Sequence, residues 1–120
     1  MRLILPTLSL ALIAGTAGAD VTLSIPLQIS AMDSVMSQTY TCSDGRAFDV
    51  QYVNAGANAL AIMDLDDEHR IFVNVVAGSG AKYVSGSHVW WTKGDTATME
   101  NTLNDSGLPD CQPQNTPPSE

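Results

Sequence analysis

Basic side chains are scarce in this sequence. The 120 residues include 5 Lys and Arg against 13 Asp and Glu, which gives a formal net charge of -8 at pH 7. Proteins that bind nucleic acid by neutralising phosphates carry clusters of Lys and Arg. The composition therefore excludes nucleic acid as a partner of this kind. The acidic balance fits either simple solubility or electrostatic attraction of a strongly basic protein partner, and composition alone does not choose between them.

The sequence also lacks a hydrophobic run long enough to cross a membrane as a helix. The apolar run at residues 3–14 is shorter than the roughly 20 residues that a span needs. It follows Arg2 and precedes Ala17-Gly18-Ala19, which is typical of a signal-peptide cleavage site. We predict a cleaved signal peptide at residues 1–19 and export of the mature chain, with an N-terminal membrane anchor as the alternative. No cysteine ends the run, so we expect no lipid anchor.

Cysteine is limited to Cys42 and Cys111. Their spacing matches neither a zinc ribbon nor a Cys-x-x-Cys redox motif. In a small exported domain, two cysteines are typical of a structural disulfide, and a domain of this size benefits from a covalent tie. We predict a disulfide between Cys42 and Cys111.

Motifs of hydrolytic enzymes are absent: the sequence contains neither Gly-x-Ser-x-Gly nor His-Glu-x-x-His. His69 closes the acidic run that begins at Asp64, but this run lacks the glycine and the distant glutamate of an EF-hand. A solvated hairpin is the favoured interpretation there, and a partly exposed strand histidine at His88. We predict no catalytic activity, no metal and no cofactor. An enzyme that uses His69 or His88 is kept as an alternative.

What the sequence does contain is a series of short β-rich runs separated by turn residues. Phe48, Val50 and Tyr52 alternate with polar residues, as in a half-buried strand. No segment has apolar residues repeating at the 3.6-residue spacing of a helix over a length that would form one. Short strands with a turn about every 8 to 12 residues predict an all-β fold, either a small antiparallel sandwich or a barrel.

Three segments follow from this pattern. Residues 20–37 form either an N-terminal extension or an edge strand, because apolar residues alternate there but Pro26 is tolerated only at a sheet edge. Residues 38–112 form the β-domain. The proline-rich residues 113–120 are predicted to be a disordered tail.

The most informative segment is residues 79–95. It places the hydroxyl of Ser79 and the ammonium of Lys93 on two glycine-bearing turns, joined by a short apolar hairpin with two adjacent tryptophans. Adjacent strand residues point to opposite faces, so one tryptophan should fill the core and the other lie outside. A lone lysine on such a turn suits insertion into a partner's pocket. The alternative is an ordinary hairpin lysine that pairs with Asp95.

These turns carry a family resemblance. The runs Ser79-Gly-x-x-Tyr83 and Trp91-x-Lys93-Gly94 resemble the paired motifs of bacterial inhibitors of c-type lysozyme, in their membrane-bound and periplasmic forms. Tyr40-Thr-Cys42, followed by Asp44-Gly45, resembles the first strand and turn of that family, and Asp110-Cys111-Gln112 resembles its last strand. The resemblance covers roughly residues 40–112. One position departs from it: His88 stands where the second motif usually opens with Tyr.

The resemblance implies an eight-stranded antiparallel β-barrel closed by the Cys42–Cys111 disulfide. It also implies a periplasmic location and a c-type lysozyme as the partner, with the loops that carry Ser79 and Lys93 inserted against the catalytic carboxylates. The lysozyme-binding residues would be Ser79, Gly80, Lys82, Tyr83, His88, Trp91, Lys93 and Gly94. Lys82 and Tyr83 would support the loop or its rim. A periplasmic ligand-binding β-domain without inhibitory action is the alternative function, and formation of a homodimer is left open.

Overall fold

The computed structural model describes residues 2–4, 11–15, 18–104 and 109–114. Parts of the predicted signal peptide (residues 1–19) and of the predicted tail (residues 113–120) lie outside these ranges, where both stay predictions. The first two residues of that tail are ordered, because Pro113 lies in a strand and the backbone N–H of Gln114 donates a hydrogen bond of 2.8 Å to the carbonyl oxygen of Thr39. Within the described ranges, no helix is long and apolar enough to cross a bilayer.

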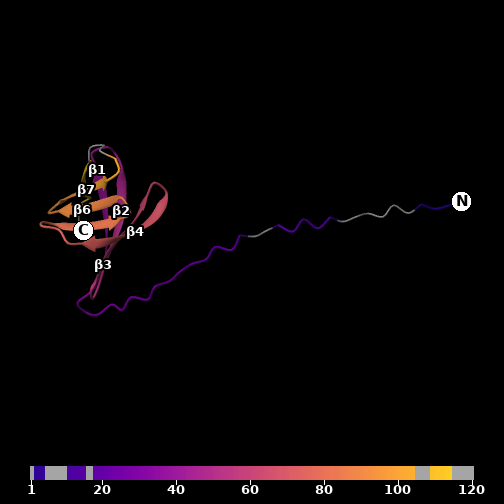
Figure 1. Cartoon of the computed structure of the whole chain (residues 1–120), viewed down its shortest axis with the longest axis horizontal. Coiled ribbons are helices and arrows are strands. Elements are labelled where there is room, and N and C mark those ends of the chain that lie inside the picture. The colour runs from indigo at the N-terminus through magenta and orange to yellow at the C-terminus, as the bar shows by residue number, and fades with distance from the viewer. Residues whose placement is uncertain (1, 5–10, 16–17, 105–108, 115–120) are drawn as a thin grey trace, which may run out of the picture.

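The described chain folds into eight strands. These are β1 (Ser34–Cys42), β2 (Ala47–Ala55), β3 (Asn58–Leu65), β4 (Glu68–Val75), β5 (Ala81–Ser85), β6 (His88–Lys93), β7 (Thr96–Asn101) and β8 (Asp110–Pro113). Each strand pairs antiparallel with the next, and β8 pairs with β1, so the sheet closes into a barrel (Figure 1). The predicted all-β antiparallel barrel is confirmed.

The segment before the barrel is extended chain. Residues 18–30 form no strand and run away from the barrel (Figure 1). β1 begins at Ser34, inside the range of residues 20–37 that the sequence left between extension and edge strand. The alternating apolar residues between Leu23 and Ile29 therefore take no part in the barrel sheet.

The barrel interior is filled by the inward face of each strand. Phe48, Val50 and Tyr52 are buried as their alternation predicts, and Trp90 at the centre has no exposed surface. The Trp90 ring packs edge-on against Tyr40, at a centroid distance of 5.0 Å. Its indole nitrogen donates a hydrogen bond of 2.9 Å to the hydroxyl of Tyr52. Burial raises the pKa of Tyr52, so its phenol stays neutral far into the alkaline range.

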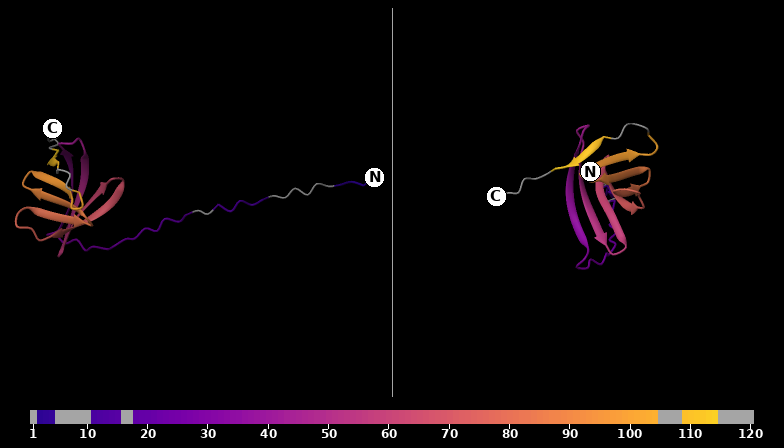
Figure 2. Two further views of the ribbon diagram at one scale, coloured as in Figure 1. Left: turned by 45° about the horizontal axis from the view of Figure 1, so that its top comes forward. Right: turned by 90° about the vertical axis from the view of Figure 1, so that its left-hand side faces the viewer.

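The disulfide lies where the barrel closes. Cys42 of β1 is directly opposite Cys111 of β8, and the two are joined, as predicted. Figure 2 shows β8, in yellow, beside the first strand of the barrel. β8 is short and pairs with β7 only at Cys111 and Asp110. The covalent bond therefore reinforces a strand that pairs with its two neighbours over only a few residues.

Successive antiparallel strands sort the turns between the two ends of the barrel. The turns after β2, β4 and β6 lie at one end, and those after β1, β3 and β5 at the other. Ser79 precedes β5 and Lys93 ends β6, so both lie at the first end. His88 begins β6 and lies at the second end.

Candidate functional site

Two exposed turns meet at one end of the barrel. Ser79 lies in the loop between β4 and β5, and Lys93 lies where β6 turns into β7. Both side chains are exposed. The ladder between β5 and β6 pairs Ala81 with Thr92. Ser79, shortly before Ala81, and Lys93, directly after Thr92, therefore lie on the same rim of the barrel. The structure thus brings together the two turns that carry the hydroxyl and the ammonium singled out from the sequence.

Gly80 allows the two turns to touch. Its φ is +66°, and a Cβ at this position would overlap the carbonyl oxygen of Thr92 and lie 3.0 Å from Cγ of Lys93. Only glycine combines this conformation with such a close approach. Gly94, with φ of +56°, needs its glycine for the backbone turn alone, since no atom lies within 4 Å of a Cβ built there.

Trp91 ties the Ser79 loop to the barrel from outside. Its neighbour Trp90 is fully buried, whereas Trp91 is only half-buried, so the two tryptophans point to opposite faces as predicted. The indole nitrogen of Trp91 donates a hydrogen bond of 2.9 Å to the carbonyl oxygen of Ser79. The backbone of the loop is therefore fixed, while the Ser79 hydroxyl has no hydrogen-bond partner within the described residues.

Both lysines of the chain lie against the same indole. The ammonium of Lys93 is 3.9 Å and that of Lys82 is 5.0 Å from the centroid of the Trp91 ring. Ion pairs in the described part of the chain join Arg46 to Asp44, His69 to Asp64 and Arg70 to Glu68, and none involves a lysine. The pairing of Lys93 with Asp95, kept as an alternative at the sequence level, does not occur there.

The remaining positions of the first motif lie on opposite faces of β5, with Tyr83 inside the barrel and Lys82 outside. Tyr83 is 8% exposed, and its ring lies 5.7 Å from that of Tyr52. Burial, with a smaller effect from the nearby Tyr40, raises the pKa of the Tyr83 phenol. Tyr83 therefore offers a partner little of its side chain. Lys82 is half-buried on the outer face.

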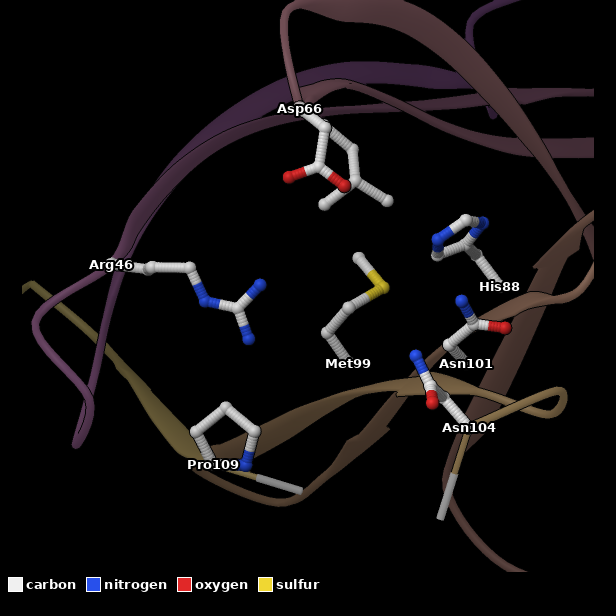
Figure 3. Close-up of a pocket in the computed structure, with 8 residues that line it drawn as sticks. Arg46, Asp66, His88, Met99, Asn101, Asn104 and Pro109 are labelled. Atoms are coloured by element: carbon white, nitrogen blue, oxygen red, sulfur yellow. The ribbon is translucent and has the colours of Figure 1, made fainter. Parts of the chain in front are cut away.

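His88 lies apart from these turns. Five residue steps along β6 separate it from Lys93, a distance on the order of 16 Å in an extended strand. It lines a cavity at the other end of the barrel, together with Arg46 and Met99 (Figure 3). His69 is exposed, with Nδ1 2.8 Å from Oδ1 of Asp64. Within the described residues, no three metal-ligating side chains cluster.

Thr92 and Thr96 are contributors that the sequence did not single out. The hydroxyl of Thr92 donates to the carbonyl oxygen of Ala81, at 3.3 Å, and that of Thr96 donates to the carbonyl oxygen of Lys93, at 3.0 Å. Both bonds brace the rim of the site. The sequence offers one clue to these two residues: each lies next to the turn that carries Lys93 and Gly94.

Comparison with known proteins identifies the family. The sequence model described as membrane-bound lysozyme-inhibitor of c-type lysozyme matches residues 40–106. The chain belongs to this MliC family. The resemblance carried by the paired turn motifs is confirmed.

Two relatives of known name share this part of the chain. The membrane-bound lysozyme inhibitor of C-type lysozyme from Pseudomonas aeruginosa is 48% identical over 64 residues, which are 52% of this chain and 50% of that protein. The protein of the same name from Cupriavidus necator is 33% identical over 69 residues, 58% of this chain and 55% of that protein. The chain thus spans about half the length of these relatives.

Solved structures of two lysozyme inhibitors have a similar fold. The crystal structure of Pseudomonas aeruginosa MliC in complex with hen egg white lysozyme matches with a TM-score of 0.65 and 34% identity, over 82% of this chain and 99% of that one. PliC-St, the periplasmic lysozyme inhibitor of C-type lysozyme from Salmonella typhimurium, matches with a TM-score of 0.58 and 28% identity, over 67% of this chain and 98% of that one.

Proposed function

We propose that this MliC-family protein inhibits a c-type lysozyme by inserting Ser79 and Lys93 into the active-site cleft. One observation supports this most directly. The two side chains are exposed on touching turns at one end of the barrel, and neither forms a hydrogen bond or ion pair with another side chain within the described residues. The names of the relatives and the complex of one of them with hen lysozyme support the same partner.

The chemistry of the target makes a cation effective. Lysozyme is the type case of a retaining glycosidase, with two catalytic carboxyl groups about 5 to 5.5 Å apart and one of them protonated. An ammonium between them gains Coulomb energy in a cleft that excludes water. It also lowers the pKa of the acid, because a nearby positive charge favours the ionised carboxylate. Lys93 would both block the substrate and remove the catalytic proton.

Ser79 would add a hydrogen bond to the same carboxylates. Its hydroxyl can donate to a carboxylate oxygen, and such charge-assisted bonds are stronger than neutral ones. The loop backbone is already held by Trp91, so little conformational freedom remains to be lost on binding. The remaining residues of the site would act as support: Gly80 and Gly94 shape the turns, and Lys82, Tyr83 and Trp91 hold the rim.

Export and location are part of this proposal. We propose removal of residues 1–19 and action in the periplasm, in line with the periplasmic Salmonella relative. The relatives matched by sequence are named membrane-bound, so the expected lack of an anchor is a separate prediction. The mass of the protein purified from a periplasmic extract tests both points. A mature chain that begins at Asp20 without added lipid is expected.

The proposal is tested by a bacterial cell-wall lysis assay with hen lysozyme. The wild-type protein should inhibit lysis. Lys93→Ala should lose about 2 to 5 kcal/mol of binding free energy, the range for removing one member of a buried charge pair. Lys82→Ala is the matched control, because it removes the other lysine from the same indole and should cause a much smaller loss.

Two outcomes would count against the proposal. Equal losses for the two lysine variants would mean that Lys93 has no special role in the cleft. Lysis that proceeds unchanged with saturating wild-type protein would favour the alternative, a ligand-binding β-domain without inhibitory action.

A further inference from the structure

The end of the barrel opposite Ser79 and Lys93 holds a cavity of about 180 Å³. Figure 3 shows Arg46, Asp66, His88 and Asn101 pointing into it from different sides. They come from four different segments: the turn after β1, the turn after β3, the start of β6 and the end of β7. The lysozyme-directed turns leave this cavity unused. Its volume is below the range of about 300 to 1,000 Å³ typical of drug-sized ligands, so its ligand must be small.

Arg46 is prepared to bind a carboxylate. Its Nε donates a hydrogen bond of 2.7 Å to Asp44, which fixes the orientation of the guanidinium. The planar group also lies 5.6 Å from the ring centroid of Phe48. Its two terminal nitrogens face the cavity in Figure 3. A guanidinium held this way offers two parallel N–H groups, the geometry that matches a carboxylate.

The side-chain amide of Asn101 supplies a donor on the opposite wall. The amide oxygen of Asn101 accepts a hydrogen bond of 3.1 Å from the backbone N–H of Leu103, which assigns its NH₂ to the cavity side. Nδ1 of His88 has almost no accessible surface and no hydrogen-bond partner in the described part of the chain, so it lies behind the cavity wall, out of reach of a ligand.

Asp66 brings a negative charge to the same cavity. It lies in the turn between β3 and β4 with φ of +52°, and its carboxylate points toward the cavity in Figure 3. Asp66 forms no ion pair within the residues described. A simple anion bound to Arg46 would be repelled by Asp66 and Asp44, and a simple cation bound to Asp66 would be repelled by Arg46. A ligand that carries both charges satisfies both groups.

We propose that this cavity binds a free α-amino acid. Its carboxylate would accept hydrogen bonds from Arg46 and from the NH₂ of Asn101, and its ammonium would lie against Asp66. A small apolar side chain would rest on Met99 and Pro109, which also line the cavity. This site is separate from the proposed lysozyme contact and does not depend on it.

The test is an NMR titration of the ¹⁵N-labelled protein with L-alanine, with acetate and ethylamine as probes that carry one charge each. Alanine should cause saturable shifts of the Asn101 side-chain amide. Each single-charge probe should bind at least about tenfold more weakly, a factor that corresponds to about 1.4 kcal/mol. Acetate or ethylamine binding as tightly as alanine would overturn the proposal, and so would the absence of saturable shifts with alanine.

The β3–β4 turn offers a matched pair of variants. Asp66→Asn and Asp67→Asn each remove one charge at neighbouring positions with positive φ, +52° and +63°, a conformation that asparagine tolerates. Only Asp66 lines the cavity. Asp66→Asn should weaken alanine binding at least about tenfold, while Asp67→Asn leaves it unchanged. Equal effects of the two variants would contradict the assignment.

A cavity-filling variant gives a second check. His88→Tyr places a larger ring in the cavity and should abolish the alanine-dependent shifts. Because the cavity and the lysozyme-directed turns lie at opposite ends of the barrel, lysozyme inhibition by Asp66→Asn should equal that of the wild type. Loss of alanine binding and loss of inhibition are thereby distinguishable. Retained alanine binding by His88→Tyr would show that the ligand lies elsewhere.

Discussion

The ammonium of Lys93 lies 3.9 Å from the centroid of the Trp91 ring. The same indole holds the Ser79 carbonyl through its N–H, so one side chain couples both turns of the proposed lysozyme-binding site. A cation over an exposed aromatic ring gains only about 0.5 to 1 kcal/mol. The contact therefore orients Lys93 without competing strongly with a pair of carboxylates.

Trp91 should be a positioning residue for lysozyme binding. Trp91→Phe keeps a ring beneath the lysine but removes the N–H that bonds Ser79, and should weaken lysozyme affinity by about 1 kcal/mol. Trp91→Leu removes the ring as well and should lose roughly 0.5 to 1 kcal/mol more. Calorimetric titration with hen lysozyme measures both. If the two variants bind as tightly as the wild type, the indole does not organise the turns.

Gly80 should tolerate no side chain. Gly80→Ala places a Cβ on the carbonyl oxygen of Thr92 and should push the Ser79 loop away from Lys93, with a loss of inhibition of at least about tenfold. Gly78→Ala is the matched control two residues earlier, where no atom lies within 4 Å of a Cβ. That variant should inhibit like the wild type. Equal inhibition by the two alanine variants would mean that contact between the turns is dispensable.

The disulfide should stabilise the barrel more than any other single link. Cys42 and Cys111 are 69 residues apart, and closing a loop of that length restricts the unfolded chain by about 4 kcal/mol in the entropic treatment. The Cys42→Ala, Cys111→Ala double variant should lose stability of that order in urea denaturation. A loss below about 1 kcal/mol would show that the β1–β8 ladder closes the barrel without help.

Stability should fall in alkaline solution. Burial raises the pKa values of Tyr52 and Tyr83, so the folded protein retains protons that the unfolded chain releases. The free energy of unfolding should be constant below about pH 9 and decrease as the pH rises past about 10, the ordinary tyrosine pKa. Urea denaturation between pH 8 and 11 measures this. A flat profile would contradict it.

Tyr52→Phe provides the control for this pH dependence. It should flatten the alkaline decrease, because one of the two shifted phenols is gone. It should also lower stability at pH 7 by about 1 to 3 kcal/mol, because the buried indole N–H of Trp90 loses its acceptor. An undiminished alkaline decrease in this variant would assign the effect to other groups.

The sequence was most informative about features that depend only on neighbouring residues, such as which side of a strand faces the core. Alternation at Phe48, Val50 and Tyr52 predicted a half-buried strand, and the adjacent tryptophans predicted one inner and one outer ring. It was less informative at the edges of the domain. Alternation between Leu23 and Ile29 is as regular as in a strand, yet those residues form none, because strand formation also requires a partner strand.

The residues of the two proposed sites differ in the same way. Ser79 and Lys93 are found from their motifs, since glycine-bearing turns leave a local signature. His88 is part of the same motif but lies at the other end of β6, where it meets Arg46 and Asp66. No local pattern predicts this, because Arg46 and Asp66 lie in two different turns that only the closed barrel brings to the same end as His88.

By itself, the sequence determined the strand content, the cysteine pair and the two turns that carry the hydroxyl and the lysine. These depend on residue type and short-range spacing. Only the tertiary structure decided that Trp91 joins both turns, that Lys93 leaves Asp95 unpaired in the described chain, and that a polar cavity forms at the far end. The reason is physical: contacts between strands depend on the pairing register and closure of the whole barrel, and these depend on every strand at once.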